Sequence, residues 1–276
     1  MKRKYKKDIF TMNKIVSLTL KKLYQLILRV WISGVKVTSY ASLCVFSAFA
    51  LAATEHAMPL DSHYLLDLSF GPAWISGSKQ NPQTFKRHTD LEITFLHNKS
   101  SNSPVFNGEQ FLGVQKAVTS NLMGQVGLVA AETSTIALNG SIWNGINSNF
   151  HNFNYKFRLS HIDVGVKGKL IYDSTFAMNP YVSAGIGMNF NQALGLGISS
   201  LDNNEVYNPF VENQSSNSFM YQVGAGLHEA LNTHWLLSVG YQFKYIGQTH
   251  LNIDGDQLNS GNLYLNVVQF EIAYLR

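Results

Sequence analysis

Residues 235–246 read Trp-Leu-Leu-Ser-Val-Gly-Tyr-Gln-Phe-Lys-Tyr-Ile, and this stretch decides the fold. Every odd position from Trp235 to Tyr245 is large and apolar or aromatic, whereas the even positions include Gly240 and Lys244. A period of two is the period of a β-strand, because successive side chains of a strand point to opposite faces. The stretch therefore predicts a strand with one large apolar face and one small or polar face.

The same alternation recurs along the chain from Tyr64 to the end. It predicts eight strands, at residues 64–74, roughly 105–118, 122–130, 162–170, 181–190, 219–228, 235–246 and 263–275. The pattern places the chain in the all-β class, with residues 64–276 as one domain.

The polar face indicates how these strands close. In residues 162–170 it carries Asp163, Lys167 and Lys169 beside Gly165. Small residues with charges of both signs suit the cramped interior of an eight-stranded barrel, where buried charges must pair. The large apolar face would then meet lipid. We predict an antiparallel up-and-down transmembrane β-barrel, with a secreted soluble sandwich as the alternative.

The connections between the expected strands alternate in length. The short ones are residues 119–121, 173–177 and 230–233, and the long ones are residues 76–104, 133–155, 191–218 and 247–262. This alternation is typical of an outer-membrane barrel with short periplasmic turns and long extracellular loops. Both ends of the barrel domain would then lie in the periplasm.

Within the first long connection, residues 90–97 also alternate between apolar and polar side chains. We place this segment as a hairpin arm or barrel extension inside the loop. A true strand of a larger barrel is the alternative.

Composition agrees with a barrel and argues against two other classes. The 276 residues include 17 Phe, 13 Tyr, 4 Trp and 21 Gly, with only 14% charged residues. The absence of an uncharged apolar run of 18 residues after position 53 excludes a helical membrane protein. The formal net charge of +4 comes from the N-terminal region, since residues 53–276 hold 11 Lys and Arg against 16 Asp and Glu. Electrostatics therefore give no support to nucleic-acid binding.

The N-terminal region predicts a signal peptide. An uncharged, largely apolar run at residues 41–51 ends in Ala50-Leu51-Ala52, which suits a signal peptidase. We expect residues 1–52 to be the leader, cleaved after Ala52, and residues 53–63 to be a short periplasmic segment. The only cysteine, Cys44, lies in the leader, and the large Leu43 before it argues against a lipoprotein. Because the basic region before the apolar run is long, Met12 is an alternative start.

Aromatic side chains fall at both ends of the expected strands. Trp235 and Tyr274 lie at the turn end, and Trp74, Tyr245 and Tyr264 lie at the loop end. Two such belts are expected where a barrel meets the two membrane surfaces. High β propensity alone is the alternative explanation for any single aromatic.

Seven segments together resemble a known family. They are Leu66-Asp-Leu-Ser-Phe-Gly-Pro-Ala-Trp74, Gly108-Glu-Gln-Phe-Leu-Gly-Val-Gln115, Gly124-Gln-Val-Gly-Leu128, Ser141-Ile-Trp143, Val166-Lys-Gly-Lys-Leu170, Pro180-Tyr-Val-Ser-Ala-Gly-Ile-Gly187 and Gly240-Tyr-Gln-Phe243. In order and spacing, over nearly all of residues 60–276, they resemble opacity-like outer-membrane β-barrel proteins within the OmpA/OmpW-like superfamily.

The resemblance implies an eight-stranded barrel in the bacterial outer membrane with variable surface loops. Some members of the family act in adhesion and others as small pores. The chain departs from the family at its end, because Leu275-Arg276 follow Tyr274 where an aromatic usually closes the sequence. This departure puts the efficiency of membrane insertion in doubt.

The sequence offers weak candidates for chemistry. Ser160 and His161 are adjacent, but neighbours on a strand point to opposite faces and cannot act as nucleophile and base. His228-Glu229 with His234, and Asp254-Gly-Asp256, lack the spacing of a zinc or calcium site. We predict no catalytic residue, no metal and no cofactor.

Charged residues on the inward faces predict an ion network inside the barrel. Its expected members are Asp67, Asp163, Lys167, Lys169, Lys244 and Glu271. A selectivity filter would use the same residue types, so a narrow pore of the OmpW type is the alternative.

The expected function lies in the extracellular loops. We predict a monomeric, adhesin-like surface protein whose partners are outer-membrane lipid, lipopolysaccharide and host surface molecules, with no nucleic acid.

Overall fold

The computed structural model describes residues 62–77, 83–86, 92–97, 103–144, 151–173, 178–201, 209–212 and 214–276. The predicted leader with its cleavage site after Ala52, and most of the predicted 53–63 segment, lie outside these residues. In the described part of the chain, no helix is long and apolar enough to span a membrane.

Eight long strands carry the fold. They are β1 (Ser62–Ser76), β4 (Val105–Thr119), β5 (Leu122–Asn144), β6 (His151–Tyr172), β7 (Asn179–Ser200), β9 (Ser215–Ala230), β10 (Trp235–Gly247) and β13 (Leu263–Leu275). Short strands lie in the connections: β2 (Gln83–Lys86), β3 (Glu92–His97), β8 (Val211–Glu212), β11 (His250–Ile253) and β12 (Asp256–Asn259).

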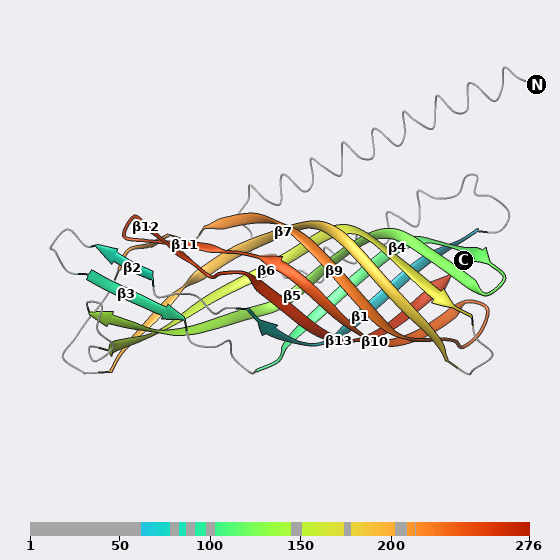
Figure 1. Ribbon diagram of the computed structural model, residues 1–276, viewed down its shortest axis with the longest axis horizontal. Helices are drawn as coiled ribbons and strands as arrows, with labels where there is room; N and C mark the ends of the chain where they lie inside the picture. Colours follow the sequence, from blue (N-terminus) through green and yellow to red (C-terminus); the bar gives the residue numbers. More distant parts are fainter. Residues whose placement is uncertain are drawn as a thin grey trace, which may run out of the picture. The chain divides into compact units, whose positions relative to one another are not determined.

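The eight long strands form a closed antiparallel ring (Figure 1). Each pairs with the next long strand along the chain, and β13 returns to β1, with Leu68 opposite Ile272. Closure removes every free edge from the ring, as lipid requires, because no water is present there to satisfy unpaired backbone groups. The predicted eight-stranded antiparallel up-and-down barrel is confirmed.

The two ends of the barrel differ. At the turn end, β4 joins β5, β6 joins β7 and β9 joins β10 through short connections, as the sequence predicts. Both described termini also lie there, where the backbones of Tyr64 and Arg276 exchange two hydrogen bonds of 2.9 Å. The short strands β2, β3, β11 and β12 lie at the opposite, loop end (Figure 1), where β8 pairs with β11.

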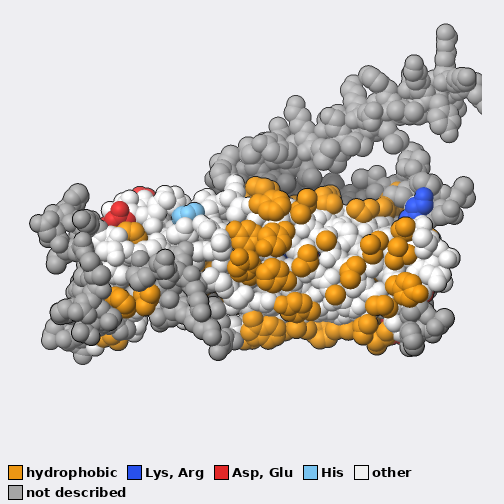
Figure 2. Space-filling view, viewed as in Figure 1, with side chains coloured by type: hydrophobic (Ala, Val, Ile, Leu, Met, Phe, Trp, Pro, Cys, Tyr) orange, Lys and Arg blue, Asp and Glu red, His pale blue; other side chains and the backbone are white. Residues whose placement is uncertain are grey.

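The large apolar faces of the strands point outward. Val126 is 53% exposed, Leu128 is 59% exposed and Val239 is 39% exposed. Apolar side chains cover the turn-end part of the barrel and thin out toward the loop end (Figure 2). In a soluble sandwich this face would be the buried core, so the sandwich alternative is wrong.

Beyond this apolar belt the barrel continues into what we call the loop-end extension. It comprises β5 from Ile136 to Asn144, β6 from His151 to Leu159, β7 from Ala193 to Ser200, and the short strands β2, β3, β8, β11 and β12. The expectation that residues 133–155 and 191–218 are mainly loops is therefore wrong. Most of residues 133–155 is strand, as is the first part of 191–218, and β11 and β12 form a hairpin within 247–262.

The side-chain pattern of β6 explains the extension. From Ile162 to Leu170 its outward face is apolar, whereas Lys156 and Arg158 point outward and are exposed nearer the loop end. The inward face changes in the opposite sense, from charged to apolar, with Phe157 and Leu159 fully buried. A strand that leaves lipid for water must exchange its two faces in this way.

Bulges adjust the alternation at the same level of the wall. The β5–β6 register shifts between Thr133 and Ile136, and the β6–β7 register shifts beside Gly195. Gly195 has φ of 116°, a conformation that glycine adopts without steric cost. β5 has one extra residue at its bulge, so its inward positions change from odd numbers, such as Thr133, to even numbers, such as Ile136. Ile136 therefore points into the core.

The segment predicted within the first connection forms a hairpin arm. Its described part, β3, pairs with β2 and with the loop-end part of β5, where Ile93 lies opposite Asn144. Since β3 leaves the β4–β5 and β5–β6 pairings intact, the prediction of a hairpin arm is confirmed. The alternative of a larger barrel is wrong.

Candidate functional site

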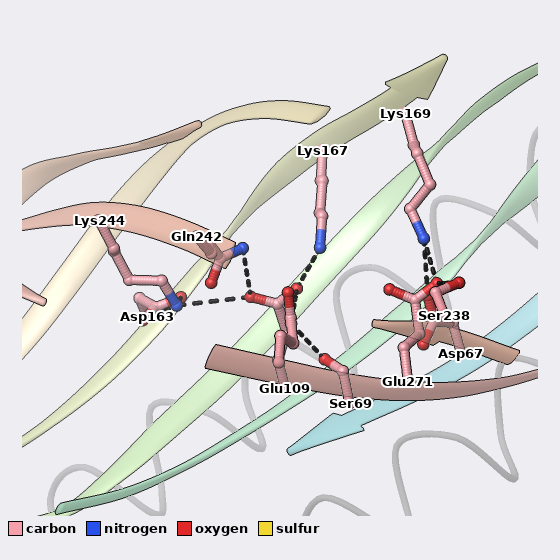
Figure 3. Close-up of polar contacts among 11 residues, drawn as sticks. Asp67, Ser69, Glu109, Asp163, Lys167, Lys169, Ser238, Gln242, Lys244 and Glu271 are labelled. Carbon is pink, nitrogen blue, oxygen red and sulfur yellow. Dashed lines mark hydrogen bonds and ion pairs between the residues drawn. The ribbon is translucent and has the colours of Figure 1, made fainter. Parts of the chain in front are cut away.

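The middle of the barrel interior holds two groups of paired charges (Figure 3). The first, which we call the central cluster, consists of Glu109, Asp163, Lys167 and Lys244. Lys167 Nζ lies 2.5 Å from Glu109 Oε1, and Lys244 Nζ lies 3.4 Å from Glu109 Oε2 and 3.1 Å from Asp163 Oδ2. Two cations thus face two carboxylates, so the cluster is balanced in charge.

Neutral polar side chains surround the central cluster. Gln242 Nε2 donates to Glu109 Oε2 at 3.4 Å, and Gln269 Nε2 donates to Ser69 Oγ at 2.5 Å. His161 Nε2 lies 3.7 Å from Asp163 Oδ2 and 3.2 Å from Thr133 Oγ1. Gln269 Nε2 also lies 3.5 Å from Glu109 Oε1. Glu109 therefore accepts from two lysines and from two amides, and it joins more partners than any other member of the cluster.

The second group, which we call the turn-side cluster, consists of Asp67, Lys169 and Glu271. Lys169 forms an ion pair with Glu271 and lies 3.5 Å from Asp67 Oδ2. Ser238 Oγ donates to Glu271 Oε1 at 3.0 Å. The Lys169 ammonium also lies 4.8 Å from the ring centre of Tyr181. One lysine here serves two carboxylates.

The strand period places these groups. Lys167 and Lys169 are two residues apart on β6, so both point into the lumen from one strand. Asp163 points inward from the same strand, Asp67 from β1, Lys244 from β10 and Glu271 from β13. Glycine leaves the space they need: at Gly240, a side chain would collide with the Tyr181 hydroxyl.

The structure divides the predicted network differently from the sequence-based expectation. All six expected residues are buried inside the barrel, but they fall into the two clusters rather than one. Lys167 pairs with Glu109, which the sequence analysis did not identify, and no ion pair joins it to Asp163 among the described residues. On β4, Phe106 and Gln110 lie on the outward face and Glu109 lies on the inward face. Because Gln110 is polar, the two faces differ little in polarity, and the sequence pattern does not identify Glu109 as an inward charge.

Apolar layers lie beyond the charges in both directions. Toward the turn end, the buried side chains are Leu65, Phe111, Val129, Leu236, Ala273 and Leu275. Toward the loop end, a larger core includes Ile136, Leu138, Phe157, Leu159, Leu251, Leu258 and Leu265. Burial in this core raises the pKa of the Tyr155 phenol well above its usual range. The described interior thus offers paired charges between apolar layers.

The weak chemical candidates lie apart. Ser160 lies on the outward face of β6 and His161 is buried inside. His228 is buried against Ser238, whereas His234 is exposed and stacks on Tyr274. Among the described residues, no three His, Cys, Asp or Glu side chains are grouped to hold a metal.

In the candidate calcium segment, a backbone N–H group already donates to one of the carboxylates. Asp254 Oδ1 accepts a hydrogen bond of 2.8 Å from the Phe210 backbone, at the tip of the β11–β12 hairpin. The segment Asp254-Gly-Asp256 is therefore a hairpin turn.

The aromatic residues lie at two levels of the outer wall. At the turn end, the rings of Trp235 and Tyr274 are 5.2 Å apart. At the loop end, Tyr245 lies 5.4 Å from Tyr264 and stacks on Tyr221 at 5.2 Å.

Further aromatics extend this set at the loop end. Phe243 stacks on Tyr264 at 5.4 Å, and Trp74 is exposed on β1. Tyr221 and Phe243 were not assigned to the belt from the sequence.

Comparison with known proteins identifies no family. No family model matches the sequence, and no curated protein sequence matches it. Among solved structures, Neisserial surface protein A is 13% identical and covers 76% of this chain and 96% of its own, with a TM-score of 0.41.

Two further solved structures are similar at the same level. The outer-membrane protease OmpT from Escherichia coli is 9% identical over 81% of this chain and 100% of its own, with a TM-score of 0.44. The attachment invasion locus protein Ail of Yersinia pestis is 10% identical over 79% and 100%, with a TM-score of 0.34.

The membrane assignment rests on the barrel itself. A closed antiparallel ring, an apolar outer belt and short turns alternating with long connections are the features of an outer-membrane barrel. The chain is a bacterial outer-membrane β-barrel protein.

Proposed function

We propose that this protein is an opacity-like, adhesin-like surface protein that neither conducts nor catalyses, and that its loop-end extension binds molecules outside the cell. The observation that carries the proposal is the extension's own apolar core. Nine residues of β6, from His151 to Leu159, continue past the apolar belt, or about 30 Å of strand. Anchoring in the membrane does not need this length.

The core of the extension favours a rigid platform. Phe95 of β3 packs edge-on against Tyr155 at 5.6 Å, so the hairpin arm is held against β6. Leu251 and Leu258 bring the β11–β12 hairpin into the same core. A platform ordered before binding loses little conformational entropy when a partner binds. The partners would be host surface molecules, and the barrel would act as a monomer.

Cell adherence tests this proposal. Asn139 and Lys156 lie directly opposite each other, so a two-residue Asn-Gly turn can replace residues 140–155 with the barrel strands kept. Bacteria that produce the full chain should adhere to host cells more than bacteria without it, and the shortened chain should lose that gain. Heat-modifiable migration of both proteins on gels would show that both barrels are assembled. Equal adherence of the two would refute the proposal.

A narrow pore is the second candidate function, and unpaired lumen atoms favour it. Both amide atoms of Gln222, Oε1 of Gln242 and Oδ1 of Asn189 are buried without a hydrogen-bond partner. Such groups are normally satisfied by ordered water, so the lumen would hold water between the apolar layers. Planar-bilayer recordings separate the candidates, because discrete conductance steps require a continuous column and the surface-protein proposal predicts silence.

A further inference from the structure

Two cations stand on the outer wall of the extension, next to the apolar belt. Lys156 and Arg158 point outward from β6 and are exposed, and the apolar belt of that strand begins at Ile162. Neither takes part in any ion pair among the residues that the structure describes. These two side chains therefore place positive charge on the wall of β6 near the level where lipid gives way to water.

Small neighbours leave both cations accessible. Arg158 lies between Ala137 of β5 and Gly195 of β7. Lys156 lies between Asn139 of β5 and Gly197 of β7 in the next row. Alternate residues of a strand are about 7 Å apart, so the two cations can contact two anionic groups of one ligand.

A hollow in the wall of the extension is lined in part by Lys156. It has a volume of about 520 Å³, and Asn139, Asn154, Lys156 and Ser199 line it together with Tyr155 and Ile198. Gly197 forms part of its floor, and a Cβ there would meet only the Lys156 carbonyl oxygen, at 3.9 Å. Amide and hydroxyl groups donate to and accept from the hydroxyls of a sugar.

From this placement we infer that the hollow binds the phosphorylated sugar headgroup of the glycolipid in the surrounding outer leaflet. Asn139, Lys156 and Ser199 are exposed on the outer wall of the extension, on the side of the lipid belt where a membrane headgroup lies. Lys156 and Arg158 complement phosphate, and the Asn and Ser side chains complement the sugar ring. The inference rests on the proposed orientation, in which the loop end is outside the cell.

Lipopolysaccharide binding to the full-length protein in detergent tests the inference. The probes are deep-rough lipopolysaccharide and the same material after enzymatic dephosphorylation, with affinity measured by native mass spectrometry. Each basic residue near an anionic headgroup contributes about a fivefold change in affinity. The double variant Lys156→Gln/Arg158→Gln should therefore bind phosphorylated lipopolysaccharide about 30-fold more weakly. It should bind the dephosphorylated form as the wild type does.

Two further variants sharpen the test. Gly197→Leu fills the hollow without strain and should also weaken binding, whereas Lys116→Gln changes an exposed lysine at the turn end and should not. Binding of the double variant within twofold of wild type would overturn the inference. So would full competition by inorganic phosphate at matched concentration, which indicates a simple anion site, or by a soluble sulfated polysaccharide, which indicates a soluble occupant.

The outcome is independent of adherence. A protein that binds lipopolysaccharide at this hollow but confers no adherence leaves the inference standing and refutes the proposed function. The reverse result refutes only the inference.

Discussion

Replacing Glu109 with leucine should destabilise the barrel more than the same change at Glu271. Glu109 is the only carboxylate paired with Lys167 among the described residues, and it shares Lys244 with Asp163. Lys167 is 3% exposed and Lys244 is fully buried. Removing one partner of a buried pair costs about 3–5 kcal/mol, because a buried charge is left uncompensated. We expect Glu109→Leu to lower the free energy of unfolding by that amount.

Glu271→Leu is the matched control. It removes a carboxylate of similar burial, but Asp67 remains 3.5 Å from Lys169 and the turn-side cluster becomes balanced in charge. We therefore expect a cost of about 1 kcal/mol, mainly from the lost hydrogen bond with Ser238. Equilibrium urea unfolding from lipid vesicles measures both variants. Equal costs would refute the division into two clusters. A cost below about 0.5 kcal/mol for Glu109→Leu would show that water solvates these charges and would also refute the account.

Three other predictions follow from the same structure. Val239→Arg places a charge on the lipid-facing wall near mid-membrane and should cost about 2–4 kcal/mol, against about 1 kcal/mol for Tyr245→Arg near the interface; equal costs in vesicle unfolding would contradict the lipid-facing assignment. Gly195→Ala forces a side chain into φ of 116°, so it should lower the unfolding free energy by about 1 kcal/mol or more and speed amide exchange in the extension. N-terminal sequencing of the mature protein should begin at Ala53 or within a few residues, and a mature chain that retains Cys44 would contradict the predicted cleavage.

The ring was predictable because one rule governs all of it. Where the ring meets lipid, its long strands alternate between an outward face rich in large apolar residues and an inward face rich in small or charged ones. The alternation of short and long connections orders the strands. That rule holds only where lipid meets the wall. Past Glu132 and Ser160 the faces exchange, and the bulges at Thr133–Ile136 and Gly195 break the period. The sequence pattern therefore predicts loops where the structure has the loop-end extension.

The sequence predicts most of the charged residues that point into the lumen, but it does not predict which of them pair. Inward charges follow from strand parity, which identifies Lys167 and Lys244 from local sequence. Their partners depend on which strands face each other across the lumen. Glu109 and Lys167 lie on β4 and β6, with β5 between them, and the β5 residues opposite them are the small Ala131 and Gly127. Local alternation carries no information on such contacts.

Cysteine labelling on intact cells tests the central claim most directly, since the only cysteine of the chain lies in the predicted leader. A membrane-impermeant maleimide should label Gln257→Cys, which is exposed in the loop-end β12, on intact cells. It should label Lys116→Cys, at the turn end, only after the outer membrane is permeabilised. It should not label Val239→Cys, which faces lipid, in either case. Labelling of Lys116→Cys but not Gln257→Cys on intact cells would show that the barrel has the opposite orientation in the membrane. It would contradict a surface function for the loop-end extension.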